Sequence, residues 1–274
     1  MQNYTIQKNI ATVRNGAVLL CQHNTTGRPV VIKRIKRDRF IEAIIAKEVH
    51  AYKTLQTTSQ DAIGVANVAQ LLDTFDDKKY CHLVLQHYAM GDLYNALKAM
   101  PQQRCTAEVA KNYFSQIALG LYHIHRHNIA HRDLSLENIF IDTNGTLKIG
   151  DFGLAIRVPM TVKCVVGKAY YMPAEIYDTR VGYDVSKVDV WSLGILLWML
   201  LTGVPLVEKA AADDAVFDFL SRSGIRSLID AWGLTSVIPD DAISMLELLL
   251  VIDPARRPSM TSVLTHPYCD CVVV

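Results

Sequence analysis

The sequence has no excess of charge of one sign and no long apolar run. Its 274 residues carry 28 basic and 27 acidic side chains, which leaves a net charge of +1. This balance gives no reason to expect nucleic acid or an anionic membrane as a partner. The longest apolar stretch, Ile195 to Leu201, is too short to cross a bilayer. Met1 is followed by polar residues instead of an apolar leader, so we do not expect secretion.

The six cysteines have no framework spacing, which favours reduced thiols and a cytoplasmic location. The nucleus and a membrane surface stay open as alternatives. The last four residues, Cys271 to Val274, match a prenylation box, although a terminal valine is atypical and no polybasic stretch precedes it. We therefore expect membrane association only if Cys271 carries a lipid, and otherwise a monomer.

The apolar pattern divides the chain near residue 90. Compact runs at Val30–Ile32 and Leu83–Leu85 are typical of buried strands, and the segment between them has helical spacing. The later part is mostly helical, and Thr106 can cap a long helix from Ala107 to His127. Two further short runs, 139–141 and 147–149, flank Asp-Thr-Asn-Gly and predict a hairpin.

The residues with the clearest chemistry form the run from His131 to Asn138 and the triplet Asp151-Phe152-Gly153. Phosphoryl transfer needs positioning and cancellation of phosphate charge more than covalent catalysis. Asp133 can accept the hydrogen of an incoming hydroxyl. Asn138 and Asp151 offer hard oxygen ligands, which suit Mg²⁺ bridging phosphates. The predicted hairpin between the two motifs can turn both toward one cleft.

Upstream, Lys33 ends a predicted strand and Glu48 lies on the following helix. One interpretation is a surface ion pair that contributes little to stability. The other is that Glu48 holds Lys33 against the α- and β-phosphates of ATP. The downstream motifs favour the second interpretation.

Together these motifs resemble the eukaryotic protein kinase family, over nearly the whole chain from Tyr4 to Tyr268. The resemblance implies an α+β, bilobal fold, with a small β-rich N-lobe carrying one regulatory helix and a larger helical C-lobe. The expected boundaries are an N-lobe at 1–86, a hinge at about 86–91, a C-lobe at 92–268 and a tail at 269–274. The implied ligands are ATP, Mg²⁺ and a protein substrate with serine or threonine hydroxyls.

The resemblance also assigns roles to single residues. Leu85 would be the gatekeeper, backbone groups of Gln86 and Tyr88 would hold the adenine, and Asp92 would bond the ribose. Glu175 would find a buried partner in Arg257. The wider ATP-binding set expected from the resemblance is Ala11, Val13, Gly16, Val18, Val31, Lys33, Glu48, Leu85, Gln86, Tyr88, Asp92 and Phe140. The regulatory hydrophobic spine would comprise Tyr52, Leu71, His131 and Phe152.

The phosphate-covering loop departs from the family pattern. Aligned on Gly16 and Val18, the first two glycines of the family fall on Ala11 and Val13. Glycine there allows close backbone approach to phosphate, so Val13 is expected to stiffen the loop and weaken ATP binding. Val31 replaces the usual alanine over the adenine and narrows the slot.

The catalytic loop departs as well, because Ser135 stands where serine/threonine kinases carry a lysine. The family's threonine after the activation-segment glycine is here Lys168, which follows Gly167. The two side chains have traded places. We therefore expect Lys168 to neutralise the transferring phosphate and Ser135 to orient Lys168, with Asp133 as the third catalytic residue.

Counting back from Glu175, the family's usual activation phosphosite falls on Cys164. Thr161 is the one hydroxyl residue between Leu154 and Gly167. We therefore expect that phosphorylation of this segment is not the main switch. The alternative is that Thr161 serves from a shifted position, with Arg132 as its basic partner.

Two functions fit these residues. The first is an active kinase acting on serine or threonine, because Lys33, Glu48, Asp133, Asn138 and Asp151 are all retained. The alternative is a pseudokinase, a nucleotide-binding or scaffolding module with little turnover, which the lost glycines and the lost catalytic-loop lysine favour.

Overall fold

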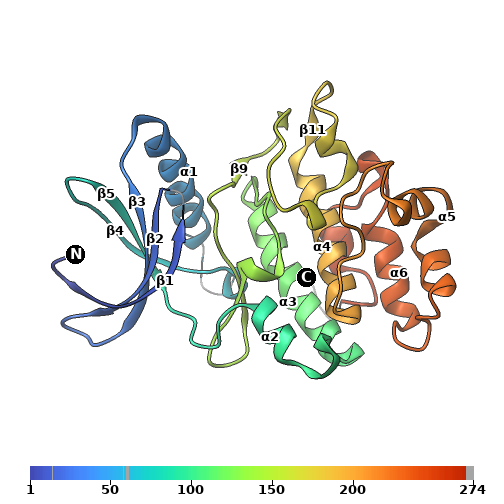
Figure 1. Cartoon of the computed structure of the whole chain (residues 1–274), viewed down its shortest axis with the longest axis horizontal. Helices are drawn as coiled ribbons and strands as arrows, with labels where there is room; N and C mark the ends of the chain where they lie inside the picture. Colours follow the sequence, from blue (N-terminus) through green and yellow to red (C-terminus); the bar gives the residue numbers. More distant parts are fainter. Residues whose placement is uncertain (14, 58, 60–61, 270–274) are drawn as a thin grey trace.

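The fold is described from a computed structural model, which covers residues 1–13, 15–57, 59 and 62–269. The sheet lies at one end of the molecule and helices α5 and α6 lie at the other (Figure 1). Cys271, the candidate lipid site, lies outside the described residues. The described cysteines Cys21, Cys81, Cys105 and Cys164 are free thiols.

The N-lobe is a five-stranded antiparallel sheet with the strand order β1-β2-β3-β5-β4. Side chains of β2 alternate between the interior and the surface, and Ala17, Leu19 and Cys21 form its inward row. The predicted strand runs at Val30–Ile32 and Leu83–Leu85 belong to β3 and β5. The five strands are β1 Tyr4–Val13, β2 Gly16–His23, β3 Pro29–Lys36, β4 Leu71–Asp76 and β5 Tyr80–Gln86.

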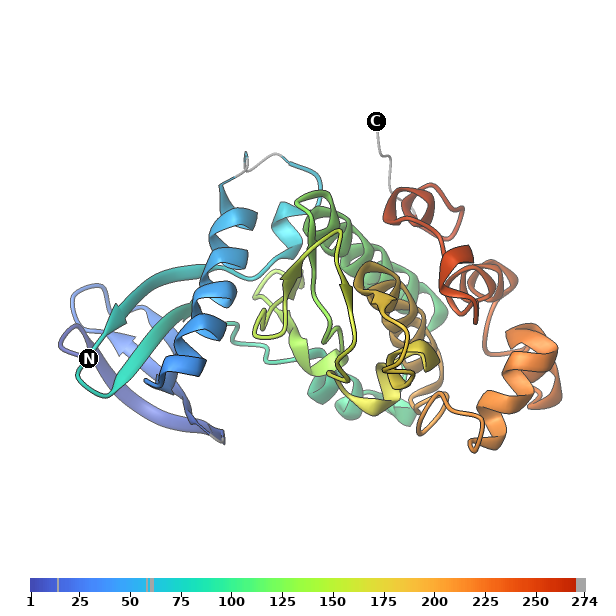
Figure 2. The same cartoon turned by 90° about the horizontal axis from the view of Figure 1, so that it is seen from above.

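Helix α1, Arg39–Gln56, stands between the sheet and the C-lobe (Figure 2). Its buried side chains include Ile45, Glu48, Tyr52 and Leu55, which recur at helical spacing and so form one face. Three of the four are apolar and anchor the helix in the main core. Glu48 is the polar member of this face, and it is aimed at the cleft between the lobes.

The C-lobe is predominantly helical. Helix α3 begins after Thr106, whose hydroxyl accepts a hydrogen bond from the Val109 N–H at 3.3 Å, and this confirms the predicted cap. The predicted end of this helix is also confirmed to within one residue. The C-lobe helices are α2 Leu93–Ala99, α3 Ala107–Arg126, α4 Val185–Thr202, α5 Ala215–Ala231, α6 Asp240–Leu249 and α7 Met260–Leu264.

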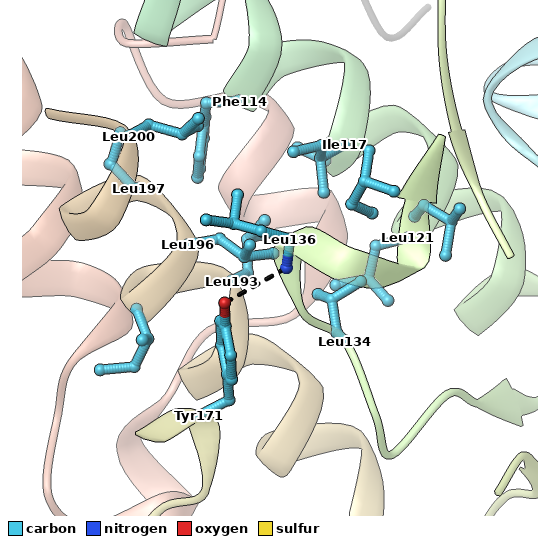
Figure 3. Packing of buried hydrophobic residues seen from close by; sticks show 14 of the residues in the cluster. Phe114, Ile117, Leu121, Leu134, Leu136, Tyr171, Leu193, Leu196, Leu197 and Leu200 are labelled. Carbon is cyan, nitrogen blue, oxygen red and sulfur yellow. Dashed lines mark hydrogen bonds between the residues drawn. The ribbon is translucent and has the colours of Figure 1, made fainter. Parts of the chain in front are cut away.

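Helix α4 forms the centre of the C-lobe. It is long and apolar enough to match a membrane-spanning helix by length and composition, but 83% of that window is buried inside the protein. Trp191 and Trp198 on this helix are fully buried. Figure 3 shows leucines of α3, α4 and the catalytic loop packed together, with the Leu136 N–H donating to the Tyr171 hydroxyl at 3.3 Å. A helix buried on all sides needs no polar face.

Short two-stranded pairs carry the loops of the C-lobe. In the predicted hairpin, the Asp142 carboxylate accepts from the backbone N–H groups of Asn144 and Thr146, and Gly145 takes a positive φ of 79°. That hairpin is therefore confirmed. The pairs are β6 Ile129–Ala130 with β9 Ile156–Arg157, β7 Ile139–Ile141 with β8 Leu147–Ile149, and β10 Thr161–Val162 with β11 Tyr183–Asp184. The expected α+β, bilobal fold is confirmed.

Candidate active site

The first cluster of the site joins Lys33 on β3 to Glu48 on α1. Lys33 Nζ donates to both carboxylate oxygens of Glu48, at 2.8 and 3.0 Å, and to Asp151 Oδ1 at 2.9 Å. The Glu48 side chain is only 2% exposed, so this is no surface ion pair. Three elements distant in sequence thus meet at the Lys33 ammonium group. Glu48 holds this ammonium in the cleft, as its expected role beside the α- and β-phosphates requires.

The charges in this cluster depend on one another. Burial opposes the charge of Lys33, but the Glu48 and Asp151 carboxylates outweigh it and raise the pKa of Lys33 well above its usual value. Burial likewise raises the pKa of Asp151, but the Lys33 ammonium outweighs it, so the net shift is downward. Lys33 therefore stays an ammonium and Asp151 a carboxylate at neutral pH.

The Asp151 triplet is held by a column of aromatic rings. The Phe152 ring packs edge-on to Tyr52 at 4.8 Å and to His131 at 5.1 Å between centroids. Tyr52 also accepts a hydrogen bond from the Asp151 N–H at 3.2 Å. Leu71, the fourth expected spine residue, is buried in the same core cluster. This column connects α1 to the catalytic loop.

The backbone of the catalytic loop is held by Asp189, a fully buried carboxylate near the N-terminus of α4. It accepts from the backbone N–H groups of His131 and Arg132, each at 2.7 Å. Arg132 and Asp151 are non-glycine residues with positive φ, 67° and 58°. Backbone in this region is strained for such residues and persists where the surroundings impose it. Both strained positions lie at the acidic residues of the site, because Asp133 follows Arg132 directly and Asp151 is itself strained.

Asp133 and Asn138 lie next to each other in this loop. Asn138 Nδ2 donates to Asp133 Oδ2 at 2.9 Å and to the Asp133 carbonyl at 2.7 Å. The Gly150 N–H donates to the Asn138 carbonyl at 2.9 Å, which ties this loop to the Asp151 triplet. Burial raises the pKa of Asp133, and Lys168 and Asn138 only partly offset it. A higher pKa makes this carboxylate a better proton acceptor.

Most of the expected ATP-binding residues line one cleft of about 360 Å³ between the lobes. Tyr88 in the hinge stacks on Phe140, with ring centroids 5.8 Å apart. Asp92 caps α2 by accepting from Asn95 N and Nδ2, both at 2.8 Å. The sequence-predicted residues that line the cleft are Val13, Val18, Val31, Lys33, Glu48, Leu85, Gln86, Tyr88, Asp92, Phe140 and Asp151.

Two expected residues, Ala11 and Gly16, do not line this cleft. A Cβ at Gly16 would lie 1.8 Å from the Arg34 carbonyl oxygen, so glycine is required there by the approach of β3. Conversely, Ile10 and Ala69 line the cleft and were missed by the sequence reasoning. Ile10 precedes the first lost glycine position, and an apolar side chain next to that loop was the available signal. Ala69 lies in a connection before β4 and carries no such signal.

The exchanged pair Lys168 and Ser135 meets in space. Lys168 Nζ donates to Ser135 Oγ at 2.5 Å, and lies 3.8 Å from Asp133 Oδ2 and 3.6 Å from Glu137 Oε2. Ser135 is fully buried, whereas the Lys168 side chain is 37% exposed. The ammonium group therefore sits beside Asp133, although its backbone belongs to the activation segment.

The end of the activation segment is tied to the C-lobe by an ion pair. Arg257 Nη2 donates to Glu175 Oε2 at 2.9 Å, and a second bond joins Nη1 to Oε1. The Arg257 side chain is fully buried and also lies over the Trp191 ring, 5.0 Å from its centroid. The expected buried partnership of Glu175 and Arg257 is therefore present.

Comparison with known proteins agrees with this geometry. The family model described as "Protein kinase domain" matches residues 4–269. An Aurora kinase of Yarrowia lipolytica is 29% identical over 98% of this chain and 68% of its own length. An Aurora kinase of Schizosaccharomyces pombe is 28% identical, over 97% of this chain and 71% of its own. Serine/threonine-protein kinase CHK1 of Saccharomyces cerevisiae is 33% identical, over 74% of this chain and 39% of its own.

A bilobal fold with a partly buried Lys33–Glu48 pair, and with two acidic motifs tied together by a backbone hydrogen bond, defines a protein kinase catalytic domain. The chain belongs to the protein kinase family. The family expected from the sequence motifs is thus confirmed.

Proposed function

We propose that this chain transfers the γ-phosphate of ATP to serine or threonine hydroxyls of a protein, with Mg²⁺ as the metal. The observation that carries the proposal is the contact of Lys33 Nζ with Glu48 and Asp151, within 3.0 Å of each. It joins the N-lobe to the metal-binding triplet across the cleft. An assembled cleft of this kind needs no large rearrangement before nucleotide binds.

Asp151 and Asn138 have the donor chemistry that Mg²⁺ requires. Asp151 supplies a carboxylate, of which Oδ1 accepts from Lys33. The side-chain NH₂ group of Asn138 donates to Asp133, which leaves the side-chain carbonyl oxygen of Asn138 for a cation. When bound, the metal would neutralise charge on the phosphates. Lys33 would hold the α- and β-phosphates from the opposite side.

The remaining roles fall to Asp133, Lys168 and Ser135. Asp133 accepts the proton of the attacking hydroxyl through Oδ1, because Oδ2 already accepts a hydrogen bond from Asn138. Lys168 places a positive charge beside the reacting phosphate, and the Ser135 hydroxyl fixes its direction. A mobile ammonium on a long stem can follow the phosphate as its charge moves.

The pseudokinase alternative was favoured by the lost glycines and by the loss of the catalytic-loop lysine. An ammonium group nevertheless lies 3.8 Å from Asp133, supplied by Lys168 from another segment. The relatives include proteins named serine/threonine kinases, which also favours turnover. The proposed partner is accordingly a protein with serine or threonine, and the free thiols of Cys21, Cys81, Cys105 and Cys164 support a reducing compartment such as the cytoplasm. We propose a monomer.

The direct test is transfer of radiolabelled phosphate from ATP to a mixture of generic protein substrates. Asp133→Asn is the matched control, because it removes the proton acceptor and keeps the side-chain shape. Acid hydrolysis of the labelled product should yield phosphoserine and phosphothreonine. Equal labelling by wild type and Asp133→Asn would contradict the proposal, and phosphotyrosine as the main product would contradict the substrate class.

A further inference from the structure

Cys164 occupies an unusual place in the activation segment. It is exposed, and Arg132 Nη2 donates a hydrogen bond to its Sγ at 2.9 Å. The position is held by its surroundings, because the Tyr183 hydroxyl donates to the Cys164 carbonyl at 2.5 Å. The pairing of β10 with β11 fixes the chain just before it. The sulfur is thus both accessible and oriented toward one cation.

Arg132 is a buried cation without an acidic partner. It is only 9% exposed, and its backbone is fixed by Asp189. Its Nε has no hydrogen-bond partner, Nη1 donates to the Leu154 carbonyl at 3.4 Å, and the guanidinium also interacts with the neutral Tyr183 hydroxyl. Among the described residues, no carboxylate forms an ion pair with it. A buried guanidinium in this state is stabilised by any anion that reaches it.

The other described cysteines are less accessible than Cys164. Cys21, Cys105 and Cys269 are buried and Cys81 is partly buried. Burial raises the pKa of Cys81 to about 12 and that of Cys105 to about 11, which keeps both as unreactive thiols. Among the described cysteines, Cys164 is therefore the most accessible to an oxidant in solution.

We propose that Cys164 is a modification site at which peroxide produces a sulfinate, and that this anion pairs with Arg132 and activates the enzyme. The proposal rests on the proposed kinase function, whose regulation it specifies. A sulfinate carries a negative charge and strong acceptor oxygens, which the neutral thiol lacks. It would bind the buried guanidinium from the position where relatives in the family carry a phosphorylated residue.

The chemistry consumes two molecules of hydrogen peroxide. In the first step the sulfur takes one peroxide oxygen, the O–O bond breaks, and a sulfenic acid and one water form. The second peroxide adds another oxygen and gives the sulfinic acid and a second water. The sulfur loses four electrons, two to each peroxide. The sulfinic acid then releases its proton at neutral pH, and thiol reductants do not reverse this product.

The test begins with the purified full chain, treated with hydrogen peroxide and then with dithiothreitol. Peptide mass analysis should show two added oxygen atoms on Cys164 and none on Cys81. Phosphate transfer should rise about five- to tenfold in wild type and stay unchanged in Cys164→Ser. Oxidation of Cys81 in preference to Cys164, or a fall in activity on oxidation of Cys164, would overturn the proposal.

A second experiment separates charge from shape without any oxidant. Cys164→Asp and Cys164→Asn have nearly equal shapes and differ in charge. The aspartate variant should be the more active of the two and should melt at a higher temperature. The difference in melting temperature should disappear when Arg132→Gln is added to both, because the guanidinium is its proposed origin.

The kinase function and the regulatory role of Cys164 can be refuted separately. If wild type transfers phosphate but the aspartate and asparagine variants are equal in activity and melting temperature, the regulatory role of Cys164 is refuted and the kinase function stands. If no variant transfers phosphate, yet the melting difference depends on Arg132, the kinase function is refuted and the Cys164–Arg132 anion site stands.

Discussion

Removal of the Lys168 ammonium group tests the most specific feature of this active site. In Lys168→Ala, Ser135 loses the bond of 2.5 Å from Nζ, and Asp133 loses the positive charge 3.8 Å away. The backbone of the segment stays tied by Glu175 and Arg257. The change should therefore affect the transferring phosphate and leave the adenine cleft intact, since Lys168 does not line it.

The expected magnitude follows from the loss of one charged donor at the transferring phosphate and from the exposure of Lys168. Removing one donor to charge that develops in the transition state costs about 3–4 kcal/mol in a water-excluded site. The Lys168 side chain is 37% exposed, so solvent screens part of this interaction. About 3 kcal/mol remains, which corresponds to about a hundredfold loss of kcat.

The assay is steady-state phosphate transfer over a range of ATP concentrations. Lys168→Ala should lower kcat about a hundredfold with little change in the KM for ATP. The double exchange Ser135→Lys with Lys168→Thr should recover much of the loss, because it returns the ammonium to the catalytic loop. A Lys168→Ala enzyme as active as wild type would refute the exchange and revive the pseudokinase alternative.

Four further outcomes are expected. Because the pKa of Asp133 is raised and the carboxylate is the active form, kcat/KM should fall as pH drops through a value above the usual aspartate range. Lys168→Met removes a charge that lowers this pKa, so the acid limb should move to higher pH; an unmoved limb would contradict the contact. Asp151→Asn should abolish thermal stabilisation by Mg²⁺-ATP, and an unchanged shift would refute the metal assignment. Val13→Gly should tighten ATP binding in calorimetry, whereas equal affinity would mean that the valine does not impede the phosphates. Arg257→Met leaves the partly buried Glu175 carboxylate without its partner, and should lower the free energy of urea unfolding by about 3–5 kcal/mol; a loss below about 1 kcal/mol would contradict this.

Much of the fold was predictable because local and long-range signals agreed. The helix cap at Thr106 and the turn at Gly145 are set by side-chain and backbone preferences that act within a few residues. The central helix α4 was different. Its apolar side chains face every direction, so no amphipathic pattern existed, and burial on all sides became visible only in the assembled lobe.

The candidate site was predictable where chemistry requires one residue type at one position. Lys33 and Glu48 come from separate elements, and their meeting with Asp151 followed from the motifs in order along the chain. The lining of the cleft was less predictable. Gly16 was expected in the ATP-binding set, but its missing side chain makes room for the Arg34 carbonyl. A position can require glycine for several physical reasons, and only the packing around it shows which one applies.

The partner of Cys164 could not be predicted either. The sequence singles out Cys164 because the family usually has a hydroxyl residue at this position. The missing hydroxyl does not indicate which residue the cysteine contacts. The approach of Arg132 depends on the positive φ of that arginine and on the Asp189 carboxylate below it. These long-range constraints leave no local pattern around residue 164. The hydrogen bond to the sulfur therefore emerged only from the folded chain.

The departures at Ser135 and Lys168 concern the handling of phosphate charge, whereas Lys33, Glu48 and Asp133 are retained. The exchange of Ser135 and Lys168 has a consequence for control. A lysine at position 135 would belong to the catalytic loop, whose backbone Asp189 holds at His131 and Arg132. Its position would therefore not depend on the state of the activation segment. Lys168 instead belongs to that segment, and its ammonium reaches Asp133 only while the segment is docked. Ordering of the segment should therefore raise kcat more steeply here than in a kinase with the usual lysine. In the double exchange of Ser135 and Lys168, that dependence should weaken, and the ratio of activities between Cys164→Asp and Cys164→Asn should shrink accordingly.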